Sequence, residues 1–310
     1  MRQQTVVKRQ AGQYHLRKNV ALGSRMQVCR TISNIRAAVA AFRAAGETVG
    51  LVTTMGALHS GHMALVAAAK AAQTRVVATI FVNPTQFGNA EDLANYPRTE
   101  DADLEMLRDA GVDAVLIPDA AEIYPRDNET IVETTRLANV LHGLVRPGHY
   151  RGVTTVVSKL FNITQPDAAY FGEKDYQQLQ VIKRMARDLQ MPVAVHGVPT
   201  VRESDGLAMS SRNARLTEND RRAAVVLSRA LDKAENEAGR RVPIDRIDQA
   251  LRTTINAEPR ARLRAVDIVD PATFAPAVGL MKGPIAIMLS VEFGPNDNPV
   301  MLIDQREITP

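Results

Sequence analysis

Residues 48–72 read TVGLVTTMGALHSGHMALVAAAKAA, and this stretch decides the fold. Its first part, residues 48–53, is a short apolar run typical of a buried strand, and an apolar helix is expected from Ser60 to Ala72. Gly56 lies in the turn that joins them. A strand that passes through such a turn directly into a helix is the beginning of a βα unit, the building block of a parallel sheet.

The same alternation continues on both sides of this stretch. Apolar residues recur at helical spacing over residues 32–42 and predict a helix there. Strands are expected at 75–82, 113–117, 168–171 and 193–198, with helices at 100–110, 153–163 and 175–189. The pattern predicts a doubly wound parallel α/β sheet of the Rossmann-like, nucleotide-binding kind.

The character of the chain changes after Pro199. A polar stretch is followed by a charged helical run from Thr217 to about Gly239, a shorter helix, and strands near 265–269, 284–292 and 300–303. We therefore expect a large domain over residues 26–200 and a second, smaller α/β domain, a lid, over residues 201–310. Residues 1–25 lack a regular apolar period and are expected to form a disordered extension, with an organelle transit peptide as the alternative.

Composition narrows the function classes. The chain has 310 residues, of which 45% are hydrophobic, and no window approaches the 18 or more apolar residues of a membrane helix, so we expect a cytoplasmic protein without a membrane partner. Residues 1–46 hold nine Lys or Arg and no acid, which leaves 29 basic against 34 acidic residues elsewhere. With 4% aromatics, no nucleic-acid partner is expected. Cys29 has no partner for a disulfide and is expected to be a packed or surface residue.

The turn after the first strand carries the clearest chemical signal. In a doubly wound sheet, ligands bind where strands end and helices begin, and a helix N-terminus offers free N–H groups to a phosphate. His59 and His62 are three positions apart there and can hydrogen-bond one anionic group. The alternative is that both imidazoles only cap and pack the helix.

Three further motifs lie in loops between the expected strands and helices. Asn83 and Gln86 present amides that can recognise a carboxylate or hydroxyl group, and Arg146 lies in a basic turn just before the helix at 153–163. Two charged groups open the helix at 175–189, where Lys174 can neutralise phosphate charge and Asp175 can accept ribose hydroxyl groups. The alternatives are an ordinary loop for the first motif, a solvated basic turn for the second and an ordinary charged helix start for the third.

The fifth motif is the polar stretch 203–213, which follows the last expected strand of the large domain. It contains Ser210, Ser211 and Arg212, two hydroxyl groups and a guanidinium that make a plausible phosphate clasp. An unremarkable interdomain linker is the alternative.

In this order, the five motifs resemble the pantothenate synthetase (pantoate–β-alanine ligase) family of the HxGH nucleotidyltransferase superfamily, from about Met26 to Asp304. The resemblance implies that pantoate reacts with ATP to give pantoyl adenylate and pyrophosphate, and that β-alanine then displaces AMP to form pantothenate. It also implies a homodimer, and Mg²⁺ that is carried by ATP, with no protein side chain assigned as its ligand.

The resemblance assigns roles residue by residue. The implied catalytic residues are His59, His62, Lys174 and Arg212. The implied ATP-binding residues are Met55, Gly56, His59, His62, Gly172, Lys174, Asp175, Ser210, Ser211 and Arg212. The implied pantoate- and β-alanine-binding residues are Met55, Asn83, Gln86, Arg146 and Gln178. Two departures from the family pattern are Thr53, where Pro is usual, and the unusual stretch from Glu292 to Met301.

Two other functions share part of this pattern. A simple nucleotidyltransferase also uses HxGH but joins a nucleotide to a phosphate acceptor and stops, so dependence on an amine separates it from a ligase. A catalytically inactive nucleotide sensor would keep the fold, but the intact charged motifs argue against it.

Overall fold

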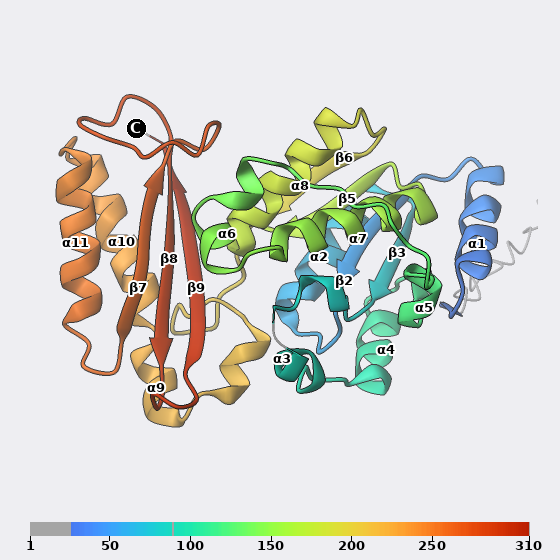
Figure 1. Cartoon of the computed structure of the whole chain (residues 1–310), viewed down its shortest axis with the longest axis horizontal. Helices are drawn as coiled ribbons and strands as arrows, with labels where there is room; N and C mark the ends of the chain where they lie inside the picture. Colours follow the sequence, from blue (N-terminus) through green and yellow to red (C-terminus); the bar gives the residue numbers. More distant parts are fainter. Residues whose placement is uncertain (1–25, 89, 310) are drawn as a thin grey trace, which may run out of the picture.

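The computed structural model describes residues 26–88 and 90–309, and the extension expected over residues 1–25 lies outside them. Two sheets organise the described residues (Figure 1). The first is parallel, in the order β1-β4-β3-β2-β5-β6, and consists of β1 (Gln27–Cys29), β2 (Val49–Thr54), β3 (Arg75–Ile80), β4 (Ala114–Leu116), β5 (Ala168–Gly172) and β6 (Ala194–Val198). The second is antiparallel, in the order β7-β8-β9, and consists of β7 (Arg262–Val269), β8 (Ile285–Phe293) and β9 (Val300–Ile308). The predicted fold class is confirmed.

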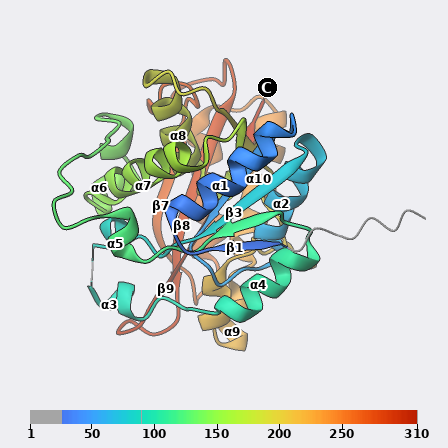
Figure 2. The same cartoon turned by 90° about the vertical axis from the view of Figure 1, so that its right-hand side faces the viewer.

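Helices cover both faces of the parallel sheet, because neighbouring strand residues point to opposite sides. Leu51 packs in one core with residues of α1 (Ile32–Ala44), α7 (His149–Thr164) and α8 (Tyr176–Asp188). Val52, the next residue, packs in another core with residues of α2 (Ser60–Ala72) and α4 (Glu100–Asp109). Figure 2 shows α1, α7 and α8 on one side of the strands and α4 on the other.

The strand order places a topological switch point beside β2. From β2 the chain crosses through α2 to β3 on one side, whereas β5 pairs with β2 on the other side. At such a point the loops after neighbouring strands diverge and leave a crevice at the carboxyl edge of the sheet. The motifs that follow β2, β3 and β5 therefore meet at this edge.

Several element boundaries differ from the expected ones. A short strand, β1, occupies Gln27–Cys29 and pairs with β4, although three residues are too few to show a strand pattern. Helix α7 begins at His149 and not near Val153, because Gly148, at φ +79°, makes the turn into it. The helical run after Thr217 divides into α9 (Glu218–Ala223) and α10 (Val226–Gly239), and β7 and β9 are longer than expected.

The second sheet has two different apolar faces. Ile287, Leu289 and Val291 of β8 pack in a core with α10 and α11 (Ile244–Asn256). Met288, which points the other way, packs in a cluster with Tyr176 of α8. The antiparallel sheet is thus held between its own helices and the larger part of the molecule, as Figure 1 shows.

Short helical segments complete the chain and frame the candidate site. They are η1 (Pro84–Gln86), α3 (Ala90–Ala94), α5 (Ala120–Ile123), η2 (Leu137–Asn139), α6 (His142–Val145), η3 (Glu173–Asp175) and η4 (Ser211–Arg215). Cys29 is a buried core residue, and burial raises the pKa of its thiol. Within residues 26–88 and 90–309, every helix is too short or too polar to cross a membrane.

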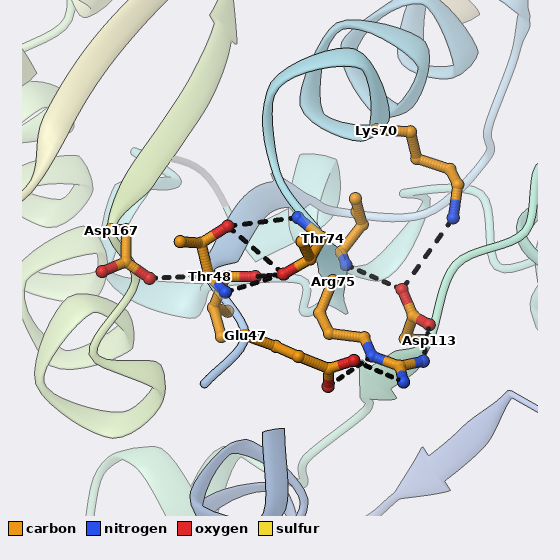
Figure 3. Close-up of polar contacts among 9 residues, drawn as sticks. Glu47, Thr48, Lys70, Thr74, Arg75, Asp113 and Asp167 are labelled. Carbon is orange, nitrogen blue, oxygen red and sulfur yellow. Dashed lines mark hydrogen bonds and ion pairs between the residues drawn. The ribbon is translucent and has the colours of Figure 1, made fainter. Parts of the chain in front are cut away.

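A polar network joins the amino ends of the parallel strands, opposite the carboxyl edge (Figure 3). The Arg75 guanidinium donates to both carboxylate oxygens of Glu47, at 2.8 Å each, and to Asp113 at 2.7 Å. Asp113 also accepts the Val76 N–H at 2.8 Å, and Asp167 accepts the Val49 N–H at 2.7 Å. Because Glu47, Asp113 and Asp167 bind Arg75 and strand N–H groups, this network stabilises the sheet. The candidate catalytic residues lie at the opposite, carboxyl edge.

Candidate active site

His59 and His62 lie together at the N-terminus of α2. The Nδ1 atom of His59 accepts the Gly61 N–H at 3.1 Å, and the Nδ1 atom of His62 accepts the His59 N–H at 3.3 Å. Since a backbone N–H only donates, both Nδ1 atoms are unprotonated, and each neutral ring carries its hydrogen on Nε2. The ring centroids are 4.2 Å apart. The pair therefore offers two neutral N–H donors beside the positive end of a helix.

Their surroundings keep both imidazoles neutral. Burial lowers the pKa of His59, and the nearby Lys174 ammonium lowers it further. Burial and the neighbouring His59 lower the pKa of His62 to about 3. Both rings thus remain hydrogen-bond donors without charge at neutral pH.

A buried acid shapes the turn before the histidines. Asp103 of α4 is 2% exposed, and its carboxylate accepts the N–H groups of Ala57 at 3.0 Å and Leu58 at 2.8 Å. The turn needs this support because both Gly56 and Ala57 have positive φ, which is sterically unfavourable for Ala57. The sequence analysis missed Asp103, although an acid beside Leu104 on the apolar face of a helix was a usable signal.

Lys174 and Asp175 lie in η3, directly after β5 and across the switch point from α2. Lys174 is half-buried, and burial lowers the pKa of its ammonium, with Asp175 acting against the shift and Arg212 adding to it. The Lys174 charge also lowers the pKa of both His59 and His62, so its ammonium lies near the two imidazole rings. Gly172 ends β5 just before them.

The linker, residues 199–217 between β6 and α9, also lies beside the N-terminus of α2. It contains Ser210, Ser211 and Arg212. A Cβ at Gly61 would be 3.5 Å from the Met209 Cβ, so the linker passes against the start of α2. Ser210 caps η4 by accepting the Arg212 N–H at 3.2 Å, and the Arg212 side chain is exposed.

Tyr96 is a second residue that the sequence analysis missed. Burial raises the pKa of its phenol, whereas the nearby Arg212 and a hydrogen bond with Ser211 act against the rise. Tyr96 therefore connects the loop after β3 with the linker.

The loop after β3 carries an amide chain. The Nδ2 atom of Asn83 donates to the Oε1 atom of Gln86 at 3.1 Å, and the Nε2 atom of Gln86 donates to the Met55 sulfur at 3.0 Å. Met55, Gln86 and Asn83 are thus brought together. Gln86 and Met55 are half-buried, whereas Asn83 is buried beneath them.

Arg146 joins this cluster through His149. The Nδ1 atom of His149 lies 2.9 Å from the Gln86 carbonyl oxygen, so Nδ1 donates, and Nε2 accepts from Arg146 at 3.2 Å. Burial and the Arg146 charge lower the pKa of His149 to about 4. Gln178 lies half-buried in the first turn of α8. The sequence analysis placed His149 in the same basic turn as Arg146 but gave it no role of its own.

Comparisons with known proteins agree with this geometry. A family model described as pantoate-beta-alanine ligase matches residues 27–307. A pantothenate synthetase from Agrobacterium fabrum (strain C58) is 50% identical over 284 residues, which cover 91% of this chain and 96% of that protein. A pantothenate synthetase from Sinorhizobium medicae (strain WSM419) is 50% identical over 287 residues, covering 92% of this chain and 97% of that protein.

Solved structures give the same result. Pantothenate synthetase from Thermus thermophilus is 43% identical with a TM-score of 0.85, covering 92% of this chain and all of that one (100%). Pantoate-beta-alanine ligase from Francisella tularensis, in complex with beta-gamma ATP and beta-alanine, is 32% identical with a TM-score of 0.73, covering 91% of this chain and 97% of that one. The chain therefore belongs to the pantoate–β-alanine ligase family.

Proposed function

We propose that the residues gathered at the carboxyl edge of the parallel sheet carry out both steps of pantothenate formation. As a member of its family, the protein is an ATP-dependent ligase that joins pantoate to β-alanine. The residue assignment rests on one observation. His59 and His62 are a pair of neutral Nε2–H donors that lie near the Lys174 ammonium. The ATP-binding roles of Met55 and Gly56 belong to the same proposal.

In the first step, a pantoate carboxylate oxygen attacks the α-phosphorus of ATP and the bond to the β-phosphate oxygen breaks. Negative charge then grows on the transferring phosphoryl group and on pyrophosphate. His59 and His62 donate hydrogen bonds to these oxygens, and Lys174 and Arg212 neutralise them. Ser210 and Ser211 bind the departing phosphates, and Asp175 holds the ribose.

In the second step, the β-alanine amine attacks the acyl carbon and AMP leaves. A mixed anhydride is already activated, so alignment supplies much of the rate and no strong general base is required. Gln86 and Gln178 hold the pantoyl group, and Arg146 binds a carboxylate, whose planar shape its guanidinium matches. The proton lost by the amine passes to solvent or to the departing phosphate.

Mg²⁺ is expected to enter with ATP. Within the described residues no group of three or more His, Cys, Asp and Glu is placed to hold a metal ion, and the exposed Asp175 carboxylate lies close to the Lys174 ammonium. This donor set fits an ion held mainly by phosphate oxygens, which would supply further neutralisation of the triphosphate.

The test is mass spectrometry of the products from ATP, Mg²⁺, D-pantoate and β-alanine. We expect pantothenate and AMP in equal amounts, with AMP release requiring the amine. Release of pyrophosphate with a stable adenylylated product and no free AMP, whether or not β-alanine is present, would favour a simple nucleotidyltransferase, and ATP binding without turnover would favour a nucleotide sensor.

A homodimer and a cytoplasmic location also belong to the proposal and rest on the family resemblance. Sedimentation equilibrium of the purified protein tests the first, with a mass near twice 33.9 kDa expected. Fractionation of cells that produce the full chain tests the second.

A further inference from the structure

Asn83 is buried too completely to be a substrate contact. It is 1% exposed, and its Nδ2 atom donates to the Gly152 carbonyl oxygen and to the Oε1 atom of Gln86, at 3.1 Å each. A carboxamide nitrogen has two hydrogens, so these two bonds use both. Its Oδ1 atom accepts from the Tyr124 hydroxyl at 2.9 Å and from the Thr85 hydroxyl at 3.0 Å.

Two backbone groups fix which way the Asn83 amide faces. The Thr85 N–H, which only donates, lies 3.3 Å from Oδ1, and the Gly152 carbonyl, which only accepts, lies next to Nδ2. Flipping the amide would place oxygen against oxygen and nitrogen against N–H. The orientation of Asn83 is therefore set by the main chain and not by any ligand.

This orientation is passed to Gln86. Because Asn83 donates to Oε1, the amide of Gln86 turns its Nε2 donor toward the Met55 side of the loop. A donor at that place suits a carboxylate or hydroxyl oxygen of the acid substrate and disfavours an ammonium group. We propose that Asn83 is a positioning residue that fixes the Gln86 amide in this donor-forward orientation and so selects the acid substrate. This inference rests on the proposed function.

A double-mutant cycle of Asn83 and Gln86 tests the proposal. With Gln86 present, Asn83→Ala should raise the KM for pantoate about 10-fold, the effect of one misdirected hydrogen bond, and change the KM for ATP less than about threefold. In a Gln86→Ala background, Asn83→Ala should change the pantoate KM less than about twofold, because Asn83 then has nothing to position. An undiminished effect in that background overturns the proposal, since it shows direct contact with substrate.

Two further variants protect the test against loss of folding. Asn83→Asp keeps the side-chain shape but replaces the Nδ2 donor by an acceptor, and it should follow the same pattern as Asn83→Ala. Tyr124→Phe removes one donor to Oδ1 but leaves both backbone contacts, so its pantoate KM should stay within about threefold of wild type. A larger effect of Tyr124→Phe than of Asn83→Asp would contradict orientation by the main chain. Thermal unfolding of each variant identifies those that are merely unstable.

The two proposals fail in different ways. A wild-type protein that makes no pantothenate overturns the proposed function and this inference with it. An active wild type with additive Asn83 and Gln86 effects overturns only this inference.

Discussion

Single backbone groups determine the chemistry of several side chains in this site. The N–H groups of Gly61 and His59 make Nδ1 the acceptor in both HxGH histidines and leave Nε2–H as the donor. The opposite holds for His149, because the Gln86 carbonyl oxygen only accepts and Nδ1 of His149 is therefore the donor. The same residue type thus presents an Nε2–H donor in one loop and supports Arg146 in another.

The Nε2–H donors of the HxGH pair should carry much of the first step. We expect His59→Ala to lower kcat on the order of 100-fold or more, the usual effect of removing one transition-state donor. His62→Gln, whose amide nitrogen can reach the position of Nε2, should retain more activity than His62→Ala. Steady-state rates of AMP formation measure both effects. If His59→Ala has the same kcat as wild type, His59 has no role in catalysis.

Acid should destabilise the protein through His62. Its pKa is about 3 in the folded protein, whereas an unfolded histidine has an ordinary pKa near 6.5. The unfolded chain therefore binds the extra proton first, and stability falls as pH drops from about 6.5 toward 3, by about 1.4 kcal/mol per pH unit for this group. Urea unfolding of wild type and His62→Gln, compared at about pH 7 and about pH 4, should show a shallower loss in the variant. If the wild type and His62→Gln lose equal stability between these two pH values, a group other than His62 causes the loss.

At the level of elements, the loop after β3, which carries Asn83 and Gln86, depends on a close approach between α7 and η1. A Cβ at Gly152 would lie 2.5 Å from the Thr85 carbonyl oxygen and 2.8 Å from the Gln86 Cα. Helix α7 can therefore support the loop only where it has no side chain, and this contact places the Gly152 carbonyl oxygen within reach of Asn83.

Gly152→Ala should separate the two elements. We expect a loss of about 1–3 kcal/mol in the free energy of unfolding, the usual effect of overpacking, together with a higher KM for pantoate. Gly239→Ala is the matched control, because nothing lies within 4 Å of its added Cβ, and it should change stability by less than about 1 kcal/mol. Equal behaviour of the two variants would mean that the helix and loop tolerate displacement.

The limits of prediction from the sequence also belong to this level. The alternation of apolar strands and helices was enough to give the parallel sheet and the loops after β2, β3 and β5. The sequence pattern was not enough to give boundaries that single residues set, as the start of α7 directly after Gly148 and the three-residue β1 show. Tyr96 was missed because its partners are distant in sequence and no local period marks it, and the local signal for Asp103 does not reveal its distant partners Ala57 and Leu58.

At the level of the whole molecule, the candidate ATP site draws on the parallel sheet and on the linker that leads to the second sheet. Lys174 follows β5, whereas the clasp with Arg212 lies in the linker to the second sheet. Contacts between the two parts include the Tyr176 hydroxyl, which donates to Glu307 of β9 at 2.8 Å, and His142, whose Nε2 lies 2.9 Å from the Ser290 hydroxyl oxygen. These contacts thus fix the relative placement of the two parts on either side of the candidate ATP site.

An ion pair fixes the linker to β9. The Arg202 guanidinium donates to the two Asp304 carboxylate oxygens at 2.7 and 2.9 Å, and also to the Gly206 carbonyl oxygen at 3.0 Å. The Asp304 side chain is only 1% exposed, so it depends on this partner. The linker that carries the predicted phosphate clasp is thereby held against the second sheet.

Arg202→Ala should weaken both stability and ATP use. It leaves a buried carboxylate without its cation, which costs about 3 kcal/mol in a buried pair, and it should raise the KM for ATP more than that for pantoate. Removing both charges, with Arg202→Met and Asp304→Asn, should recover part of the stability because no unpaired charge remains, while the ATP defect persists. Arg222→Ala, in the exposed pair with Glu218, is the control and should change stability by less than about 1 kcal/mol. If the double variant is no more stable than Arg202→Ala, the buried charge is not what makes the single change harmful, and the linker must be held by its packing.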